Sequence, residues 1–340
     1  MNYPEYLKVG DTIGICAPSD GIADEVKIRK LELAEKQLNE LGYKVIETDH
    51  VRTSIKGRSA DAETRAKEFM DLYLNDEVKL IICATGGDFM LEMIPYINFD
   101  LLKTAKPKWV QGYSDVTSII FLLTSMLDIP TMHAQTIKDY AMRPLFKNLT
   151  DALDLMSGKE VVQYSFEKYE KEWQDTTYEN MEDQYNMTEP VEWKNLNGEE
   201  KISISGRLLG GNIEIIKDII GTKYDHINKY ISRHKEDGII WFIDIFELTT
   251  PELIRTFFVF KNAGYLDNCK GIIIGRPLFL REDYEINLKE ALKVSLSDTN
   301  IPVIFDADIG HVSPQFSLIN GSYVDIFSSE GKGYIKTYLK

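Results

Sequence analysis

The sequence has few cysteines and lacks the common metal-binding and nucleotide-binding motifs. Its three cysteines are an odd number without CxxC spacing, so neither a disulfide scaffold nor a thiolate metal site is predicted. Histidines paired at ligand spacing and the H-E-x-x-H motif are missing, and we expect no metal or other cofactor. The glycine patterns of dinucleotide and P-loop sites are also missing, which leaves nucleotide binding by those motifs unsupported.

Long apolar runs and a positive charge balance are absent as well. No stretch approaches membrane-spanning length, and the first residues lack the basic-then-apolar pattern of a signal peptide, so a cytoplasmic protein is expected. The formal net charge of −15 argues against nucleic acid or an anionic membrane as the main partner. What remains is an ordinary globular composition, with 44% hydrophobic residues over 340 positions, which predicts two domains.

Strands and helices alternate over residues 1–160. Apolar runs typical of buried strands lie at 11–17, 45–46, 78–83 and 108–111. Apolar residues recur at helical spacing over 28–41, 61–74 and 116–127. Because strands that alternate with helices form parallel sheets covered on both faces, an α/β domain is expected here.

The pattern changes between residues 161 and 201. This acidic and aromatic stretch has little periodicity but too many aromatic side chains for a disordered linker, so an ordered, irregular crossing is predicted. A second domain is expected over 202–340. Its strands are predicted near 202–207, 239–243, 271–275, 302–305, 316–319 and 323–327, and its helices near 212–219 and 251–263.

Ser114 is the residue most suggestive of chemistry. It follows Gly112 and Tyr113 at the point where a predicted parallel strand ends and an apolar helix begins, which is where open α/β sheets place reacting groups. The backbone N–H groups that follow it are available at the helix N-terminus and could hold a developing oxyanion. The alternative is that Ser114 is only a helix N-cap, a common role for serine before a helix.

A serine nucleophile requires a positioned base, and His311 is the best candidate among five histidines. It lies in the turn-rich segment 308–314 between two predicted strands, although a plain turn histidine is the alternative. His133 follows a short apolar strand and either lines a pocket or is a satisfied structural histidine. For the carboxylate of a triad, Asp244 ends a strongly apolar strand, and Glu247 competes three residues later.

The ordered set of motifs resembles the serine LD-carboxypeptidases, including the microcin C self-immunity peptidases. The matching segments are Gly10–Ile13, Ala17–Ser19, Arg65–Ala66 with the later Asp76, Ala84–Gly87, Gly112–Thr117, Ile129–Thr131, His133, Gly206–Asn212, the Asp244 strand, Gly271–Gly275 and Gly310–His311. They cover nearly the whole chain, and their order and spacing are more specific than any single segment. Trp173 and the aromatic crossing are closer to the self-immunity branch.

The resemblance implies a hydrolase with a Rossmann-like parallel-sheet N-terminal domain and a β-rich α+β C-terminal domain. It implies that Ser114 is the nucleophile and that His311 is the general base and acid. The oxyanion hole would combine the backbone N–H of Asp115 with one from Gly86 or Gly87. The family normally has Glu where this chain has Asp244, which reaches about 1.5 Å less far. Three outcomes are therefore open. Asp244 orients His311, Glu247 takes its place, or the activity is impaired. A homodimer is also implied.

Three functions follow from this resemblance. The first is a peptidase that removes a terminal D-amino acid from an L-centred murein tetrapeptide, with Arg207 or Arg276 as the cation for the substrate carboxylate. The second is a self-immunity peptidase that cleaves a peptidyl or aminoacyl nucleotide amide, with Trp173 or Trp193 offering an aromatic face to the base. The third is a peptide-binding homologue that has lost catalysis.

Overall fold

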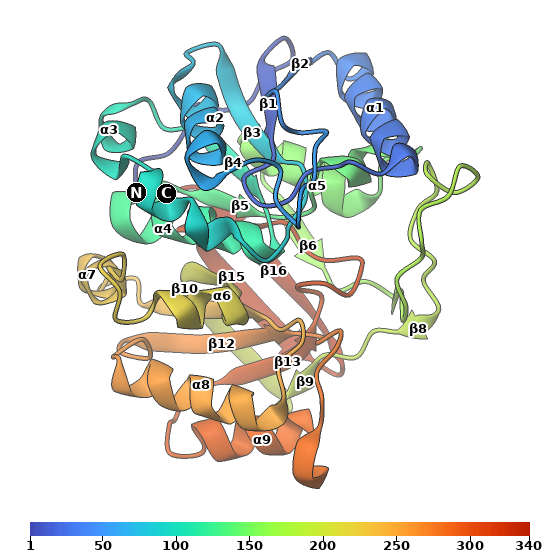
Figure 1. The fold of residues 1–340 in the computed structure, drawn as a ribbon. Coiled ribbons are helices and arrows are strands. Elements are labelled where there is room, and N and C mark those ends of the chain that lie inside the picture. The colour runs from blue at the N-terminus through green and yellow to red at the C-terminus, as the bar shows by residue number, and fades with distance from the viewer. The chain divides into compact units, whose positions relative to one another are not determined.

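The structure, a computed structural model, describes residues 1–340 and divides into two units (Figure 1). The first unit is built from residues 1–160 together with 174–185, and the second from 161–173 together with 186–340. The sequence predicted the boundary near residue 160, but it treated 161–201 as a single crossing. That segment is shared between the two units, and it carries the short strands β6 (Val162–Tyr164), β7 (Lys168–Tyr169), β8 (Glu189–Pro190) and β9 (Lys194–Asn195).

The first unit contains a parallel sheet with neighbours in the order β5-β4-β3-β1-β2. Its strands are β1 (Thr12–Cys16), β2 (Lys44–Glu47), β3 (Val78–Cys83), β4 (Trp109–Gly112) and β5 (Thr131–His133). The three central strands are almost wholly buried, as their continuous apolar runs predict for a sheet covered on both faces. The parallel-sheet prediction for this half of the chain is confirmed.

Helices cover this sheet from both sides. Figure 1 shows α1 (Glu25–Glu40) and α2 (Ala62–Leu74) on opposite sides of it. Each begins at an aspartate, Asp24 or Asp61, whose carboxylate accepts a backbone N–H of the first turn. The remaining helices of the unit are α3 (Phe99–Thr104), α4 (Thr117–Leu127) and α5 (Lys147–Met156). None of the helices in the protein combines the length and hydrophobicity needed to cross a bilayer.

The second unit contains a mixed sheet with the order β6-β16-β15-β10-β11-β12-β13-β9. Four neighbouring strands of this sheet run parallel, and they are β10 (Lys201–Asn212), β11 (Ile239–Asp244), β12 (Cys269–Gly275) and β13 (Val303–Ala307). The antiparallel strands β15 (Tyr323–Ser329) and β16 (Lys332–Tyr338) extend the sheet beyond β10. The predicted β-rich C-terminal half is confirmed, with a larger parallel portion than an α+β description suggests.

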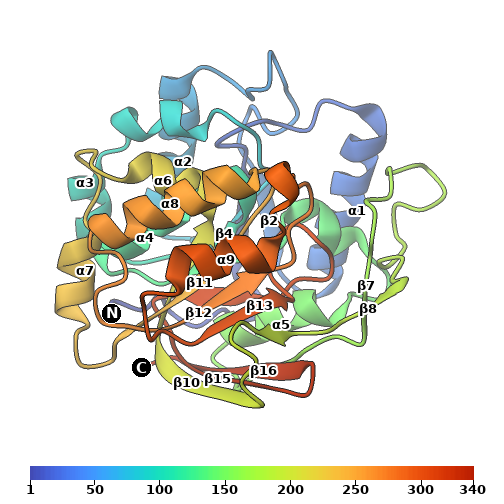
Figure 2. The same cartoon turned by 90° about the horizontal axis from the view of Figure 1, so that it is seen from below.

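The helices of this unit are α6 (Ile213–Ile219), α7 (Ile227–Arg233), α8 (Thr250–Asn262) and α9 (Leu288–Leu296). Helices α8 and α9 pack side by side over the parallel strands (Figure 2). β10 is longer than predicted, because Gly210 and Gly211 continue the strand instead of ending it. A side chain at Gly210 would collide with the backbone of Phe242 on β11, so glycine allows the two strands to approach here.

Candidate active site

Ser114 occupies a sharp turn between β4 and α4. It begins a short 3₁₀ turn, Ser114–Val116, and its backbone has φ +62°, in the left-handed region that non-glycine residues rarely adopt. Its side chain caps neither this turn nor α4, so the N-cap alternative is wrong. Strained backbone of this kind clusters at functional sites.

The glycine before Ser114 is required by the same turn. A Cβ at Gly112 would lie only 2.6 Å from Cγ1 of Val116, so the valine fills the space that a side chain at 112 would occupy. The sequence differs from the G-x-S-x-G elbow of α/β-hydrolases at Val116. The structure forms an elbow with a glycine on one side of the serine only.

The loop after β3 lies directly against Ser114. An ideal Cβ on Gly86 would lie 2.9 Å from Cβ and 3.0 Å from Oγ of Ser114, and 3.7 Å from the backbone nitrogen of Asp115. The backbones at 86 and 115 therefore both lie close to the side chain of Ser114. Gly87, with φ +151°, continues this loop against Ser19, whose hydroxyl would collide with any side chain at 87.

His311 and Asp244 form a buried pair in the second unit. Nδ1 of His311 lies 3.0 Å from Oδ1 of Asp244, and the exposed fractions of the two residues are 3% and 0%. Asp244 ends β11, and His311 follows Gly310 in the loop after β13. A side chain at Gly310, which has φ +90°, would collide with the Asp244 carboxylate. Because residue 310 is a glycine, the backbone of the loop that carries His311 can lie directly against Asp244, whose side chain is shorter than that of glutamate.

Glu247, the alternative acid, lies elsewhere. Its side chain is exposed, and its backbone N–H donates to Oε1 of Glu214 at 2.9 Å. Glu214 also accepts the N–H of Phe246 at 2.8 Å, which fixes the turn that follows Asp244. Burial raises the pKa of Glu214, and the nearby Asp244 carboxylate raises it further. No local pattern points to Glu214, because its partners are more than 30 residues away in the sequence.

The two candidate cations are bound to other groups. Arg207 donates through Nε and Nη2 to Asp237, and it lies five residues before Asn212, whose β11 partner is Asp244. At about 3.3 Å per residue, Arg207 is some 16 Å along the sheet from that acid. Arg276 is buried, with Nη2 donating to Asp308 at 2.7 Å and Nη1 to the Asp306 carbonyl at 3.0 Å. Neither guanidinium is left exposed for a substrate carboxylate.

His133, the remaining pocket candidate, is fully buried at the end of β5. Its ring lies edge-on to the ring of Tyr113, with 6.2 Å between the centroids. It is therefore next to the residue that precedes Ser114. This contact places His133 near the serine elbow, behind Tyr113.

An aromatic cluster covers His311. The Phe246 ring lies 4.4 Å from the imidazole, Trp173 stacks on Phe246 at 5.9 Å, and Phe279 meets Trp173 edge-on at 6.0 Å. Nε1 of Trp173 donates to the carbonyl of His311 at 2.9 Å. About half of the Trp173 and Phe279 surfaces is exposed, so the cluster offers an open aromatic face. Trp193 offers no such face, because it is only 2% exposed and its Nε1 donates to Asp308.

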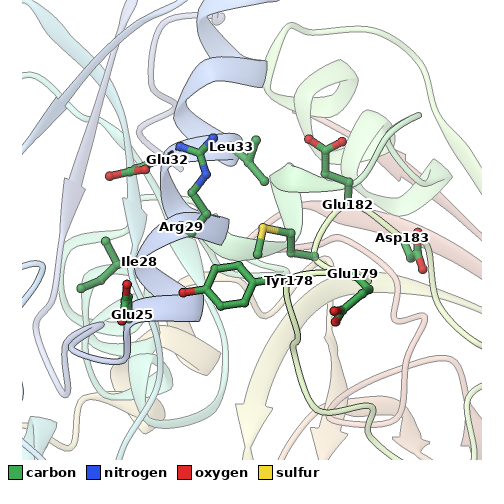
Figure 3. A pocket seen from close by; sticks show the side chains of 10 residues that line it. Glu25, Ile28, Arg29, Glu32, Leu33, Tyr178, Glu179, Glu182 and Asp183 are labelled. Carbon is green, nitrogen blue, oxygen red and sulfur yellow. Dashed lines mark hydrogen bonds and ion pairs between the residues drawn. The ribbon is translucent and has the colours of Figure 1, made fainter.

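A cavity of about 630 Å³ lies elsewhere in the first unit, between α1 and residues 178–183. Acidic side chains from both segments surround Arg29 and Tyr178 in it (Figure 3). None of the predicted site residues lines it. No group of three or more histidine, cysteine or acidic side chains with metal-ligand geometry occurs in the structure.

The predicted site residues thus form two sets. Ser114, the elbow and the loop at 86–87 belong to the first unit, whereas Asp244, His311 and the aromatic cluster belong to the second. The sequence missed Phe246 and Phe279, because contacts between segments 30 to 140 residues apart leave no local pattern.

The fold is shared with solved structures of MccF proteins. MccF in complex with glutamyl sulfamoyl guanosine matches with a TM-score of 0.80 at 21% identity, over 100% of this chain and 99% of that one. An MccF-like protein from Streptococcus pneumoniae in complex with AMP matches with a TM-score of 0.79 at 23% identity, over 97% of this chain and 99% of that one. These similarities concern the fold.

The sequence is similar to relatives with two kinds of name. The microcin C7 self-immunity protein MccF of Escherichia coli is 24% identical over 98% of this chain and 95% of its own length. The "Probable murein peptide carboxypeptidase" of Bacillus subtilis is also 24% identical, over 99% of this chain and 95% of its own length. The profile of the LD-carboxypeptidase N-terminal domain matches residues 13–134, and that of the C-terminal domain matches 205–326. The chain therefore belongs to the LD-carboxypeptidase family, peptidase family S66.

Proposed function

We propose that this chain is a serine carboxypeptidase that hydrolyses an amide bond of a small peptide through an acyl-enzyme. The observation that carries the proposal is the strained Ser114 elbow against Gly86, in a chain that also holds the buried His311–Asp244 pair. Serine hydrolases use these two arrangements together, the first to present the hydroxyl and the second to take its proton.

In this mechanism Asp244 accepts a hydrogen bond from Nδ1–H of His311, which leaves Nε2 as the basic nitrogen. Nε2 takes the proton of the Ser114 hydroxyl while Oγ attacks the substrate carbonyl carbon. The backbone N–H groups of Asp115 and of Gly86 or Gly87 stabilise the oxyanion. His311 then gives the proton to the leaving amine, and a water molecule, activated in the same way, releases the acyl group.

The preferred substrate class is a murein tetrapeptide with a terminal D-amino acid. The Bacillus subtilis relative, named a probable murein peptide carboxypeptidase, supports a murein peptide as the substrate. This activity would place the protein in peptidoglycan recycling in the cytoplasm. Since Arg207 and Arg276 hold Asp237 and Asp308, we assign the substrate carboxylate to neither. A homodimer is part of the same proposal, and light scattering after gel filtration tests it.

A second candidate is a self-immunity activity on an aminoacyl or peptidyl nucleotide amide. The observation that favours it is the exposed Trp173 face beside His311. Solved relatives of the same fold hold a glutamyl sulfamoyl guanosine or AMP. Aromatic faces bind planar bases by stacking, so this surface suits a nucleoside moiety.

Turnover of a murein tetrapeptide and of an aminoacyl sulfamoyl adenosine by the purified protein tests both candidates. Ser114→Ala should lower kcat on the true substrate by at least about 10³-fold. Trp173→Ala should raise KM for the nucleotide substrate more than for the tetrapeptide if the second candidate holds. Peptide binding without turnover of either would favour the homologue that has lost catalysis.

A further inference from the structure

The loop that flanks Ser114 has no regular secondary structure of its own. Residues 84–89 follow β3, approach Ser114 at Gly86, and end where a 3₁₀ turn begins at Met90. An oxyanion hole needs donors fixed in place before the reaction. Groups outside the loop must therefore hold it.

The side chain of Asp115 is one such group. Asp115 is 2% exposed, and its Oδ2 accepts both the hydroxyl proton of Ser19 and the backbone N–H of Met90, the latter at 2.8 Å. Ser19 belongs to the loop after β1, and its hydroxyl lies against Gly87. Oδ2 of Asp115 therefore connects the turn at Ser114 to two loops. One is the loop that contains Ser19, and the other is the loop 84–89, which it binds at the end next to Met90.

Arg65 joins the same two loops from the other side. It projects from α2, is 1% exposed, and donates through Nη1 to the carbonyls of Pro18 at 3.0 Å and Phe89 at 3.1 Å. Nη2 donates to Glu92 at 3.0 Å. Burial lowers the pKa of Arg65 and raises that of Asp115, and the hydrogen bonds that Asp115 accepts from Ser19 and Met90 oppose the shift of its pKa only in part.

We propose that the Asp115 carboxylate and the Arg65 guanidinium are positioning residues, which hold the loop 84–90 so that its N–H groups face the oxyanion formed at Ser114. This role rests on the serine mechanism proposed for the chain. Neither group touches the substrate. The backbone of Asp115 donates to the oxyanion, while its side chain fixes the opposite wall of the hole. Arg65 acts only through the carbonyls at 18 and 89.

The alternative roles are bulk stabilisation and a direct effect of charge, and Asp115→Asn separates them from positioning. Oδ1 of Asp115 has no hydrogen-bond partner. An asparagine can therefore keep its oxygen on Ser19 and Met90 and place its NH₂ where Oδ1 lies, which preserves both bonds without the charge. Asp115→Ala removes both bonds, and Ser19→Ala removes one.

The experiment measures kcat, KM and thermal unfolding for these three variants and Arg65→Met, on the substrate that the wild type turns over. Positioning predicts that Asp115→Ala and Arg65→Met lower kcat by about 100-fold with KM within about threefold, because a misplaced donor acts in the transition state. Ser19→Ala should fall between Asp115→Ala and the wild type, and Asp115→Asn should lose less than about tenfold. Ser157→Ala, which removes a hydroxyl bonded to Leu153 in the same unit, is the matched control.

Asp115→Ala with kcat within threefold of the wild type overturns the inference. So does a loss in Asp115→Asn as large as in Asp115→Ala, which would assign the effect to charge. If Asp115→Ala unfolds below the assay temperature, Ser19→Ala decides instead, and a kcat equal to that of the wild type in Ser19→Ala overturns the inference. Ser114→Ala in the same assay separates the two proposals, since full activity there contradicts the serine mechanism itself.

Discussion

Nδ1 of His311 lies 3.0 Å from Oδ1 of Asp244, with both side chains buried. An aspartate reaches this imidazole because Gly310 brings the backbone of the histidine loop against the carboxylate. The sequence left open whether Asp244, Glu247 or neither could orient His311. The contact with Asp244 and the exposure of Glu247 give the geometric basis for choosing Asp244.

Replacement of the acid should lower the rate and leave binding nearly unchanged. Asp244→Ala and Asp244→Asn should lower kcat by about 10³- to 10⁴-fold, because the imidazole loses the acceptor that sets its tautomer and stabilises its cation. Steady-state kinetics on the peptide substrate measures this effect. Glu247→Gln is the control, and a larger loss there than in Asp244→Asn would reverse the assignment.

Gly310→Ala should lower the rate because it disturbs the contact between His311 and Asp244. The new Cβ would collide with the Asp244 carboxylate, in addition to the strain of a positive φ. Gly198→Ala is a matched control, because Gly198 has φ +79° and open space around its Cβ position. We expect at least about a 100-fold lower kcat for Gly310→Ala and less than about a twofold change for Gly198→Ala. Equal effects would show that backbone strain alone is responsible.

The stability of the protein should carry a pH dependence from Glu214. Burial raises its folded-state pKa, so between the unfolded value, about 4.3, and the raised value the folded state binds more protons than the unfolded state. Stability from this group is therefore lost as the pH rises through that window. Thermal unfolding of the wild type and of Glu214→Gln from about pH 4 to 8 should show the wild type losing stability relative to the variant as pH rises. A difference that is constant or grows in the other direction would contradict this.

Trp173 should support the histidine loop as well as offer a surface. Trp173→Phe keeps an aromatic ring but loses the N–H bond to the His311 carbonyl, and we expect kcat to fall about threefold to tenfold, in line with one hydrogen bond of about 1 kcal/mol. Trp173→Ala also uncovers Phe246 and should lose more. Phe258→Ala, on an exposed ring of α8, controls for the loss of a surface aromatic. Wild-type kinetics in Trp173→Ala would remove this residue from the site.

Much of the fold could be predicted because its signals are local. The apolar runs of β1, β3 and β11 and the aspartate caps of α1 and α2 are visible in short windows. Strand β16 was missed although its residues alternate in burial, and α9 was missed although Leu288, Ala291, Leu292 and Leu296 lie on one buried face. The pattern for both elements is present in the sequence.

Less of the site could be predicted, because its geometry depends on contacts between residues that are far apart in the sequence. Arg207 binds Asp237, 30 residues later in the sequence, and Arg276 binds Asp308, 32 residues later. At such separations the sequence does not show whether an arginine is paired with a carboxylate or free to bind a substrate. The buried roles of Asp115 and Arg65 depend on the loops at Ser19 and Met90. The left-handed backbone of Ser114 is not a preference of serine itself, and the sequence does not show that Val116 packs against Gly112 in the same turn.

The most direct test of the serine mechanism is the covalent labelling of Ser114 by a fluorophosphonate, followed by intact-protein and peptide mass spectrometry. A serine nucleophile at position 114 predicts one adduct per chain on the peptide that contains Ser114, no adduct in Ser114→Ala, and labelling at least about 100-fold slower in His311→Ala. Active enzyme that acquires no adduct, or an adduct on another residue whose modification abolishes turnover, would contradict it.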